Sequence, residues 1–196
     1  LMTQAEQTEA TQTYVVKRTP LTKILRAHWN TLRACPRGYL HGLQKALLLG
    51  GLDLRKLLYS IFYFVEAVLI GQWMMARRLH HLHVHFATPA ATVGLLASQI
   101  FPLTFSLTVH GPDEFYDVPG YRLAEKVAGA QFVCCIGTYA RSQLMSCSSP
   151  AEWDKLIVTP LGIDPSTFTP RPFRSHPAPF ELLCVGRLVP VKGQLM

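Results

Sequence analysis

The stretch Thr104–Phe115, TFSLTVHGPDEF, decides the predicted fold. Thr104–Val109 has the β-branched and aromatic bias of a buried strand, and His110-Gly111-Pro112 ends that strand abruptly. Open parallel sheets bind ligands just beyond the carboxyl ends of their strands, where His110 is expected to lie. Because histidine side chains titrate near neutral pH, His110 could donate a proton, accept one or polarise a ligand there. The alternative is that His110 only caps its strand through hydrogen bonds.

Strands and helices alternate on both sides of this stretch. Thr88 and Pro89 form a typical helix start, with an N-cap followed by proline at the first helical position. The predicted strands are Leu82–Phe86, Thr104–Val109, Phe132–Ile136 and Lys155–Thr159. The predicted helices between them are Ala90–Ile100, Tyr121–Gly129 and Thr138–Ser146. This alternation predicts an α/β fold with a doubly wound parallel sheet.

The part of the chain before this sheet is basic and helical in pattern. Leu1–Thr13 is polar, so we expect it to be frayed, and it shows no signal-peptide pattern. Tyr14–Val16 is a candidate short strand, and Leu21–Ala34 and Tyr39–Leu49 are predicted helices.

Leu54–Leu79 is a long apolar segment with its apolar residues at helical spacing. Glu66 lies at its centre, and an acidic residue at the middle of a bilayer costs about 2.5–3.5 kcal/mol on insertion scales. We therefore predict a helix in the core or lying at a membrane interface, rather than a membrane span.

Charge and cysteine usage restrict the setting of the protein. Residues 1–80 contain 11 Lys and Arg against 4 Asp and Glu, whereas residues 81–196 contain 8 of each, so the whole net charge of +7 lies in the first part. Such a distribution favours a polyanionic neighbour, namely a membrane surface, a nucleic acid or a phosphorylated substrate, although a solvated basic face is the alternative. Five cysteines without CxxC spacing indicate a reducing compartment.

The last part of the sequence changes character. Prolines are dense within residues 165–179, which predicts a linker, and Phe180–Val185 then has the pattern of a strand. The predicted organisation is a first domain over residues 1–164, a linker over 165–179 and the start of a second domain over 180–196. Since 17 residues cannot bury a core, we expect the chain to be a piece of a longer protein.

Two cations follow the predicted strand Phe180–Val185. Gly186 and Arg187 lie at its end, and Lys192 lies five residues after Arg187 at a predicted helix start. Cations beside oriented backbone N–H groups suit a diphosphate. Ordinary surface cations near a turn are the alternative interpretation.

Several segments, in order, resemble the retaining GT-B glycosyltransferases of family 4, and especially their exopolysaccharide and colanic-acid branch. The segment GRLVPVKG is similar to the opening of the second domain of that family. The segments that resemble its first domain are HVHFATPAATVGLLAS, FSLTVHGPDEF, CCIGTYARSQLM and VTPLGIDPSTFTPRP. The resemblance extends from about His83 to the end of the chain.

The resemblance implies roles for particular residues. Arg187 and Lys192 match the paired cations that hold the donor diphosphate, and His110 matches the strand-end histidine near the transferred sugar. Leu161 stands where the family pattern has Asn. The residues that we expect to line the cleft are Gly111, Asp113, Glu114, Gly162 and Gly186.

The implied activity is transfer of a sugar, with retention, from a nucleotide-sugar to a lipid-linked or polysaccharide acceptor in bacterial exopolysaccharide biosynthesis. The resemblance implies no metal, no cofactor apart from the donor substrate and no nucleic-acid partner. It implies a cytoplasmic enzyme that is peripheral at the anionic inner face of the membrane. The family's first strand with its Gly-rich loop has no counterpart near residue 1, and its second acidic motif would lie beyond Met196. We therefore expect this chain alone to be inactive.

Two other functions remain open at this point. His81, His83 and His85 alternate along a predicted strand and share a face, so with His110 they could serve a metal-dependent hydrolase. Alternatively, the basic helices could make the chain a non-enzymatic membrane-docking module. Elemental analysis tests the first alternative, and a longer sequence tests the second.

Overall fold

The computed structural model describes residues 3–169, 172, 179, 182–189 and 192–194. The chain divides into two compact units, residues 1–161 and residues 162–196. In the second unit, the described part of the predicted strand, residues 182–185, forms no strand. Leu182, Leu183 and Val185 are each at least 87% exposed there. A strand requires a paired neighbour, and this segment pairs with none of the described residues.

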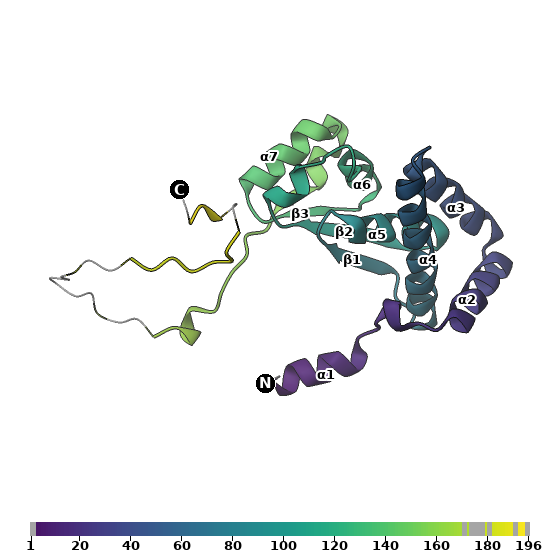
Figure 1. Ribbon diagram of the computed structural model, residues 1–196, viewed down its shortest axis with the longest axis horizontal. Helices are drawn as coiled ribbons and strands as arrows, with labels where there is room; N and C mark the ends of the chain where they lie inside the picture. The colour runs from purple at the N-terminus through teal and green to yellow at the C-terminus, as the bar shows by residue number, and fades with distance from the viewer. Residues whose placement is uncertain (1–2, 170–171, 173–178, 180–181, 190–191, 195–196) are drawn as a thin grey trace. The chain divides into compact units, whose positions relative to one another are not determined.

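The first unit is built on a four-stranded parallel sheet (Figure 1). The strands are β1 (His81–His85), β2 (Thr104–Val109), β3 (Val133–Cys135) and β4 (Leu156–Val158). Their order in the sheet is β1-β2-β3-β4, and each neighbouring pair is parallel. The prediction of an α/β fold with a parallel sheet is therefore confirmed.

The helices that connect these strands lie on one face of the sheet. They are α5 (Pro89–Ile100), α6 (Leu123–Gly129) and α7 (Thr138–Cys147). Right-handed crossovers between strands that follow one another in a single direction place all of their helices on the same side. Double winding requires the strand order to reverse, and the order of the described strands does not. The described sheet is accordingly wound on one face only, unlike the predicted sheet.

Side-chain burial follows this one-sided arrangement. Along β2, Phe105 and Leu107 belong to the hydrophobic core between the sheet and the crossover helices. On β1, Val84 is buried on the same face, whereas His81, His83 and His85 project from the opposite face and remain exposed. Histidine and apolar residues alternate in the β1 sequence HLHVH because only one face of the strand is covered.

A second hydrophobic core lies between α5 and three further helices, α2 (Leu21–Ala34), α3 (Pro36–Gly50) and α4 (Leu54–Ala76). Helix α5 is buried on two sides, because Ala91 and Leu95 pack in the sheet core whereas Leu96 and Ile100 pack in the helical core. A helix placed between two apolar layers must be apolar all round, which explains the sequence of α5.

Helix α4 is the long apolar segment of the sequence. Within the described residues it is the one helix whose length and composition would allow it to cross a membrane. Its middle carries Phe64, Ala67 and Val68, which are at most 3% exposed in the helical core. The interpretation of this segment as a core helix is supported by that packing.

The N-terminal segment differs from the prediction in two places. Residues 4–12 form helix α1 (Gln4–Gln12), because Thr3 and Glu6 make a reciprocal capping box, although none of the helix is buried. The predicted strand Tyr14–Val16 is absent. Tyr14 instead stacks on Trp73 of α4, and the 3-10 helix η1 (Val16–Arg18) follows.

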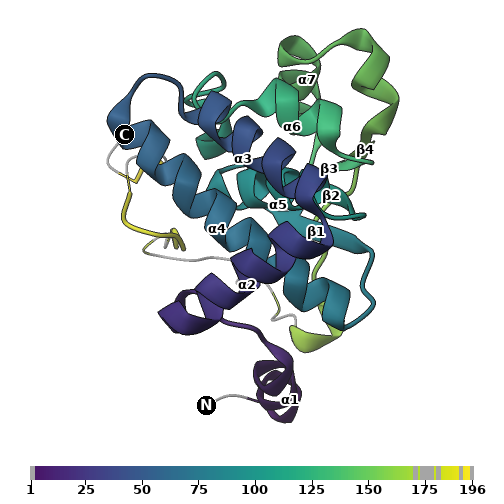
Figure 2. The same cartoon turned by 90° about the vertical axis from the view of Figure 1, so that its right-hand side faces the viewer.

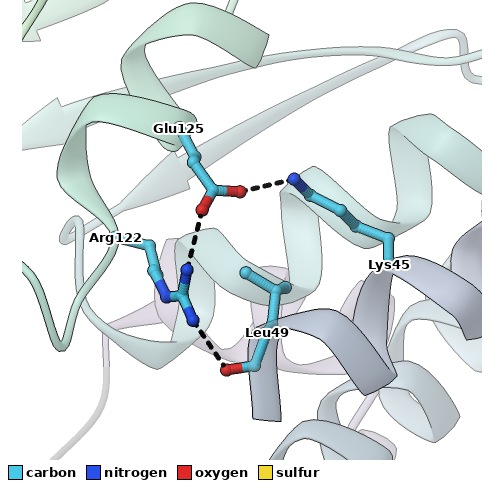
Figure 3. A network of polar contacts seen from close by, with 4 residues as sticks. All are labelled: Lys45, Leu49, Arg122 and Glu125. Carbon is cyan, nitrogen blue, oxygen red and sulfur yellow. Dashed lines mark hydrogen bonds and ion pairs between the residues drawn. The ribbon is translucent and has the colours of Figure 1, made fainter. Parts of the chain in front are cut away.

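A polar network joins α3 to α6 (Figure 3). Lys45 of α3 pairs with Glu125 of α6, which also accepts a hydrogen bond of 3.1 Å from Arg122. The other guanidinium nitrogen of Arg122 donates to the Leu49 carbonyl over 3.2 Å. Burial raises the pKa of Glu125, but the two cations outweigh it and lower that pKa below its ordinary value. The network therefore links the helical layer, through α3, to the crossover helix α6.

Candidate functional site

The carboxyl ends of β1, β2 and β3 meet at one edge of the sheet. The Phe86 N–H donates to the Thr108 carbonyl over 2.9 Å, and the Ile136 N–H donates to the Val109 carbonyl over 3.3 Å. These bonds hold the turns after the three strands side by side. Because parallel sheets bind ligands at this edge, we take it as the candidate site.

His110 lies at this edge, immediately after β2, and is half-buried. Its Nε2 atom lies 2.8 Å from Nδ1 of His85, and its ring centroid lies 4.5 Å from that of Phe86. Phe86 has a φ of 72°, a left-handed conformation that bulky residues rarely adopt. This conformation ends β1 and accompanies the contact of the Phe86 ring with His110. His110 Nδ1 forms no hydrogen bond within the described residues, so it is available to a ligand.

Glu114 fixes the backbone around His110. Its carboxylate lies in the 3-10 helix η2 (Pro112–Phe115) and is only 2% exposed. It accepts hydrogen bonds from the N–H groups of His110 and Gly111 after β2 and from the N–H group of Ala87 after β1. The sequence predicts that Glu114 lines the cleft, and the structure buries it instead. Its charge is satisfied by three backbone donors that would otherwise lack partners.

Lys126 of α6 contacts the turn after β1 and is 1% exposed. Its Nζ donates to the Ala87 and Thr88 carbonyls over 2.8 and 2.9 Å. Burial lowers the pKa of Lys126 to about 7, although Glu114 and Glu125 oppose the shift. Sequence patterns do not single out this residue. It lies beside the buried Leu123 and Val127 on α6, but its two carbonyl partners are 39 and 38 residues away in the chain.

The exposed face of β1 carries a ladder of imidazoles and hydroxyls. His81 lies 2.7 Å from Thr104 Oγ1 and 2.8 Å from Ser106 Oγ, each through a different ring nitrogen. His83 likewise lies 2.7 Å from Ser106 Oγ and 2.8 Å from Thr108 Oγ1. All four ring nitrogens of these two residues are therefore occupied by hydroxyl groups.

This ladder bears on the metal hypothesis. Within the part of the chain that the structure describes, no group of three or more His, Cys, Asp or Glu side chains could hold a metal ion. His81, His83 and His85 follow one another along the strand, and only His85 reaches His110. Burial lowers the pKa of His83, and the neighbouring His85, His81 and His110 lower it further. A neutral His83 imidazole suits the two contacts of its ring nitrogens with the hydroxyl groups of Ser106 and Thr108.

The other predicted site residues are placed as follows. Gly111 lies at the edge beside His110, and Asp113 is exposed on η2. In the second unit, Gly162, Gly186, Arg187 and Lys192 are exposed.

A tight local structure forms around Gly186 in the second unit. The Val189 N–H donates to the Arg187 carbonyl over 2.9 Å, and the Lys192 N–H donates to the Val189 carbonyl over 3.0 Å. A Cβ atom on Gly186 would lie 3.7 Å from Cγ of Lys192. The Lys192 side chain thus lies beside Gly186, the residue that precedes Arg187.

The chain is therefore an α/β protein with a parallel sheet, and its candidate site at the strand ends carries His110 and His85. Comparisons with family models, with curated protein sequences and with solved structures find no match to this chain.

Proposed function

We propose that this chain is the acceptor-side part, with the first residues of the donor side, of a retaining GT-B glycosyltransferase. The observation that carries the proposal is His110 at the carboxyl end of β2. Its ring is positioned by His85 and Phe86, and its backbone is fixed by the buried Glu114. A fixed imidazole with one unoccupied nitrogen, at the edge where parallel sheets bind ligands, suits a sugar hydroxyl near a reacting carbon.

In the proposed reaction, the bond from the anomeric carbon to the donor diphosphate breaks and a bond to an acceptor hydroxyl oxygen forms. The hydroxyl proton passes to the departing diphosphate. His110 contacts the transferred sugar, and Arg187 and Lys192 neutralise the developing charge on the diphosphate. Near a protein surface, a cation about 4 Å from a phosphate contributes roughly 4 kcal/mol before desolvation. The proposed acceptor is a lipid-linked saccharide or a growing polysaccharide, and the proposed setting is the cytoplasmic side of a bacterial membrane.

Histidine NMR of the 196-residue chain tests this proposal. The probes are uridine and guanosine diphosphate sugars and a short polyprenyl-diphosphate saccharide, each titrated while the imidazole signals are recorded. We expect at least one probe to shift the His110 signal, and His110→Asn to raise the Kd of that probe about tenfold or more.

The matched control is His81→Asn, at the opposite end of β1, which should leave the Kd unchanged. If no probe shifts any histidine signal, or if His81→Asn weakens binding as much as His110→Asn does, the proposal is wrong. Incubation of the chain with the same donor is expected to show no turnover. Robust transfer by this chain would contradict the assignment of the donor site to two domains.

A further inference from the structure

One face of helix α2 is apolar because it packs in the helical core. Ile24 and Ala27 pack in the helical core against α4, and Thr31 is 1% exposed and accepts a hydrogen bond of 3.0 Å from Gln72. His28 packs on Phe64 with ring centroids 5.6 Å apart. These contacts use the inner side of α2. An ordinary surface helix would carry polar residues on its other side.

The outer side of α2 instead carries an apolar strip, which we call the α2 strip, made of Leu21, Leu25 and Trp29. These side chains are 67%, 62% and 58% exposed. Since residues four apart lie above one another on a helix, the three form a continuous row. Figure 2 shows α2 in front of α4, on the outside of the helical layer. Packing in the core therefore does not account for the apolar row on the outer side of α2.

The charges around the α2 strip are of one sign. Residues 10–52 contain seven Lys and Arg and no Asp or Glu. Lys45 is neutralised by Glu125 (Figure 3), whereas Lys23, Arg26 and Arg33 form no ion pair within the described residues. The Arg33 guanidinium lies 5.7 Å from the centroid of the Trp29 ring. Arg26 and Arg33, both exposed, thus border the strip, and α2 contains no acidic residue.

We propose that the α2 strip docks this protein on the surface of an anionic lipid bilayer, with α2 lying in the plane of the interface. Leu and Trp side chains enter the boundary of the acyl chains, and the cations pair with lipid phosphates. A nucleic acid would match the cations but leave the apolar row without a partner. The row and the cations together match a bilayer that is apolar inside and anionic at its surface.

This assignment differs from the sequence-based expectation about Leu54–Leu79. That segment is α4, whose middle is already used in the core, so the interfacial role falls on α2. The inference rests on α2 and its charges and does not require sugar transfer. The failure of one proposal therefore leaves the other standing.

Vesicle co-sedimentation of the 196-residue chain tests the inference. Vesicles of phosphatidylcholine alone are compared with vesicles that contain about one third phosphatidylglycerol, across a salt series. We expect binding to the anionic vesicles only, weakening as salt screens the exposed charges. Arg26→Gln with Arg33→Gln should weaken binding roughly 25-fold, at about fivefold for each cation near the surface. Leu25→Gln with Trp29→Gln should weaken it about tenfold or more.

The controls use exposed residues elsewhere. Arg141→Gln removes an exposed cation from α7, and Ile157→Gln removes a half-exposed apolar residue from β4, so neither should change binding. Circular dichroism verifies that each variant is folded. Equal binding to neutral vesicles, absence of binding, or losses in the controls as large as in the α2 variants would each overturn the inference. The chain could instead self-associate in a concentration-dependent way that Leu25→Gln with Trp29→Gln abolishes. That result would also overturn the inference, since the strip would then join two copies of the chain.

Discussion

Lys126 shows how a single buried charge can support the edge of the sheet. Its ammonium donates to two carbonyls in the turn after β1, and the Glu114 carboxylate accepts the N–H of Ala87 in the same turn. We expect Lys126→Met to lower the free energy of unfolding by about 2 kcal/mol or more. The substitution leaves the Ala87 and Thr88 carbonyls without the side-chain nitrogen that donates to both of them. Urea denaturation at pH 7 measures this loss.

Lys155→Met is the matched control, because Lys155 pairs with Glu152 at the partly exposed surface. It should cost less than about 1 kcal/mol. An equal loss in the two variants would show that the burial of Lys126 has no special effect.

The stability should also depend on pH through Lys126. Unfolding restores its ordinary pKa of 10.5, whereas burial lowers the pKa to about 7 in the folded protein. Between these pH values the unfolded chain binds more protons, so this residue makes the free energy of unfolding rise with pH. This stabilising contribution of Lys126 is present above pH 10.5 and is lost progressively as the pH falls to 7. Denaturation at several pH values from 6.5 to 9.5 should show a steeper rise for the wild type than for Lys126→Met. If the free energy of unfolding rose equally with pH in the wild type and in Lys126→Met, the pH dependence would not come from Lys126.

At the scale of elements, α3 approaches α5 closely through two glycines. A Cβ atom on Gly38 would lie 2.2 Å from the Ile100 carbonyl oxygen, and one on Gly42 would lie 2.3 Å from Ile100 Cγ1. Alanine improves helix propensity by about 1 kcal/mol, but we expect Gly38→Ala and Gly42→Ala each to destabilise the protein by about 1–3 kcal/mol through the clash. Thermal and urea denaturation measure these losses.

A double-mutant cycle with Ile100→Ala separates the two clashes. Truncating Ile100 removes the atoms that Gly42→Ala would meet, so that pair should show a favourable coupling. Gly38→Ala meets the backbone of Ile100, which the truncation leaves in place, so no coupling is expected there. Gly162→Ala, with no atom within 4 Å of its Cβ, is the neutral control. Coupling at Gly38 as large as at Gly42 would contradict this account.

The elements also show which features a sequence pattern can predict. The strand Thr104–Val109 was predictable residue for residue, because its β-branched and aromatic run is bounded by His110-Gly111-Pro112. The contacts of Glu114 and Lys126 with Ala87 were not, because Ala87 lies 27 and 39 residues away from them in the chain. Local patterns assign charged residues to the surface, and long-range contacts alone reverse that assignment. The strand order is long-range in the same way, which is why double winding was predicted where the described strands never reverse.

At the scale of the whole molecule, the basic half and the strand-end site belong to different layers of the first unit. The seven excess cations precede the sheet in the sequence, on and around helices that pack on α5 from the side away from the strands. His110 lies at the carboxyl edge of the sheet, in the other layer. The proposed docking surface and the proposed strand-end site therefore share no side chains.

The first unit should also fold by itself. The buried residues of both hydrophobic cores lie between Ala27 and Leu156, and none of the described residues after Leu161 is among them. We expect a chain that ends at Leu161 to keep its free energy of unfolding within about 0.5 kcal/mol of the 196-residue chain. A chain that ends at Ser148 is the control. It lacks β4, whose Leu156 is 3% exposed, and should lose about 2 kcal/mol or more. Urea denaturation of the three chains makes the comparison. A loss above about 1 kcal/mol on removing residues 162–196 would show that they stabilise the first unit after all.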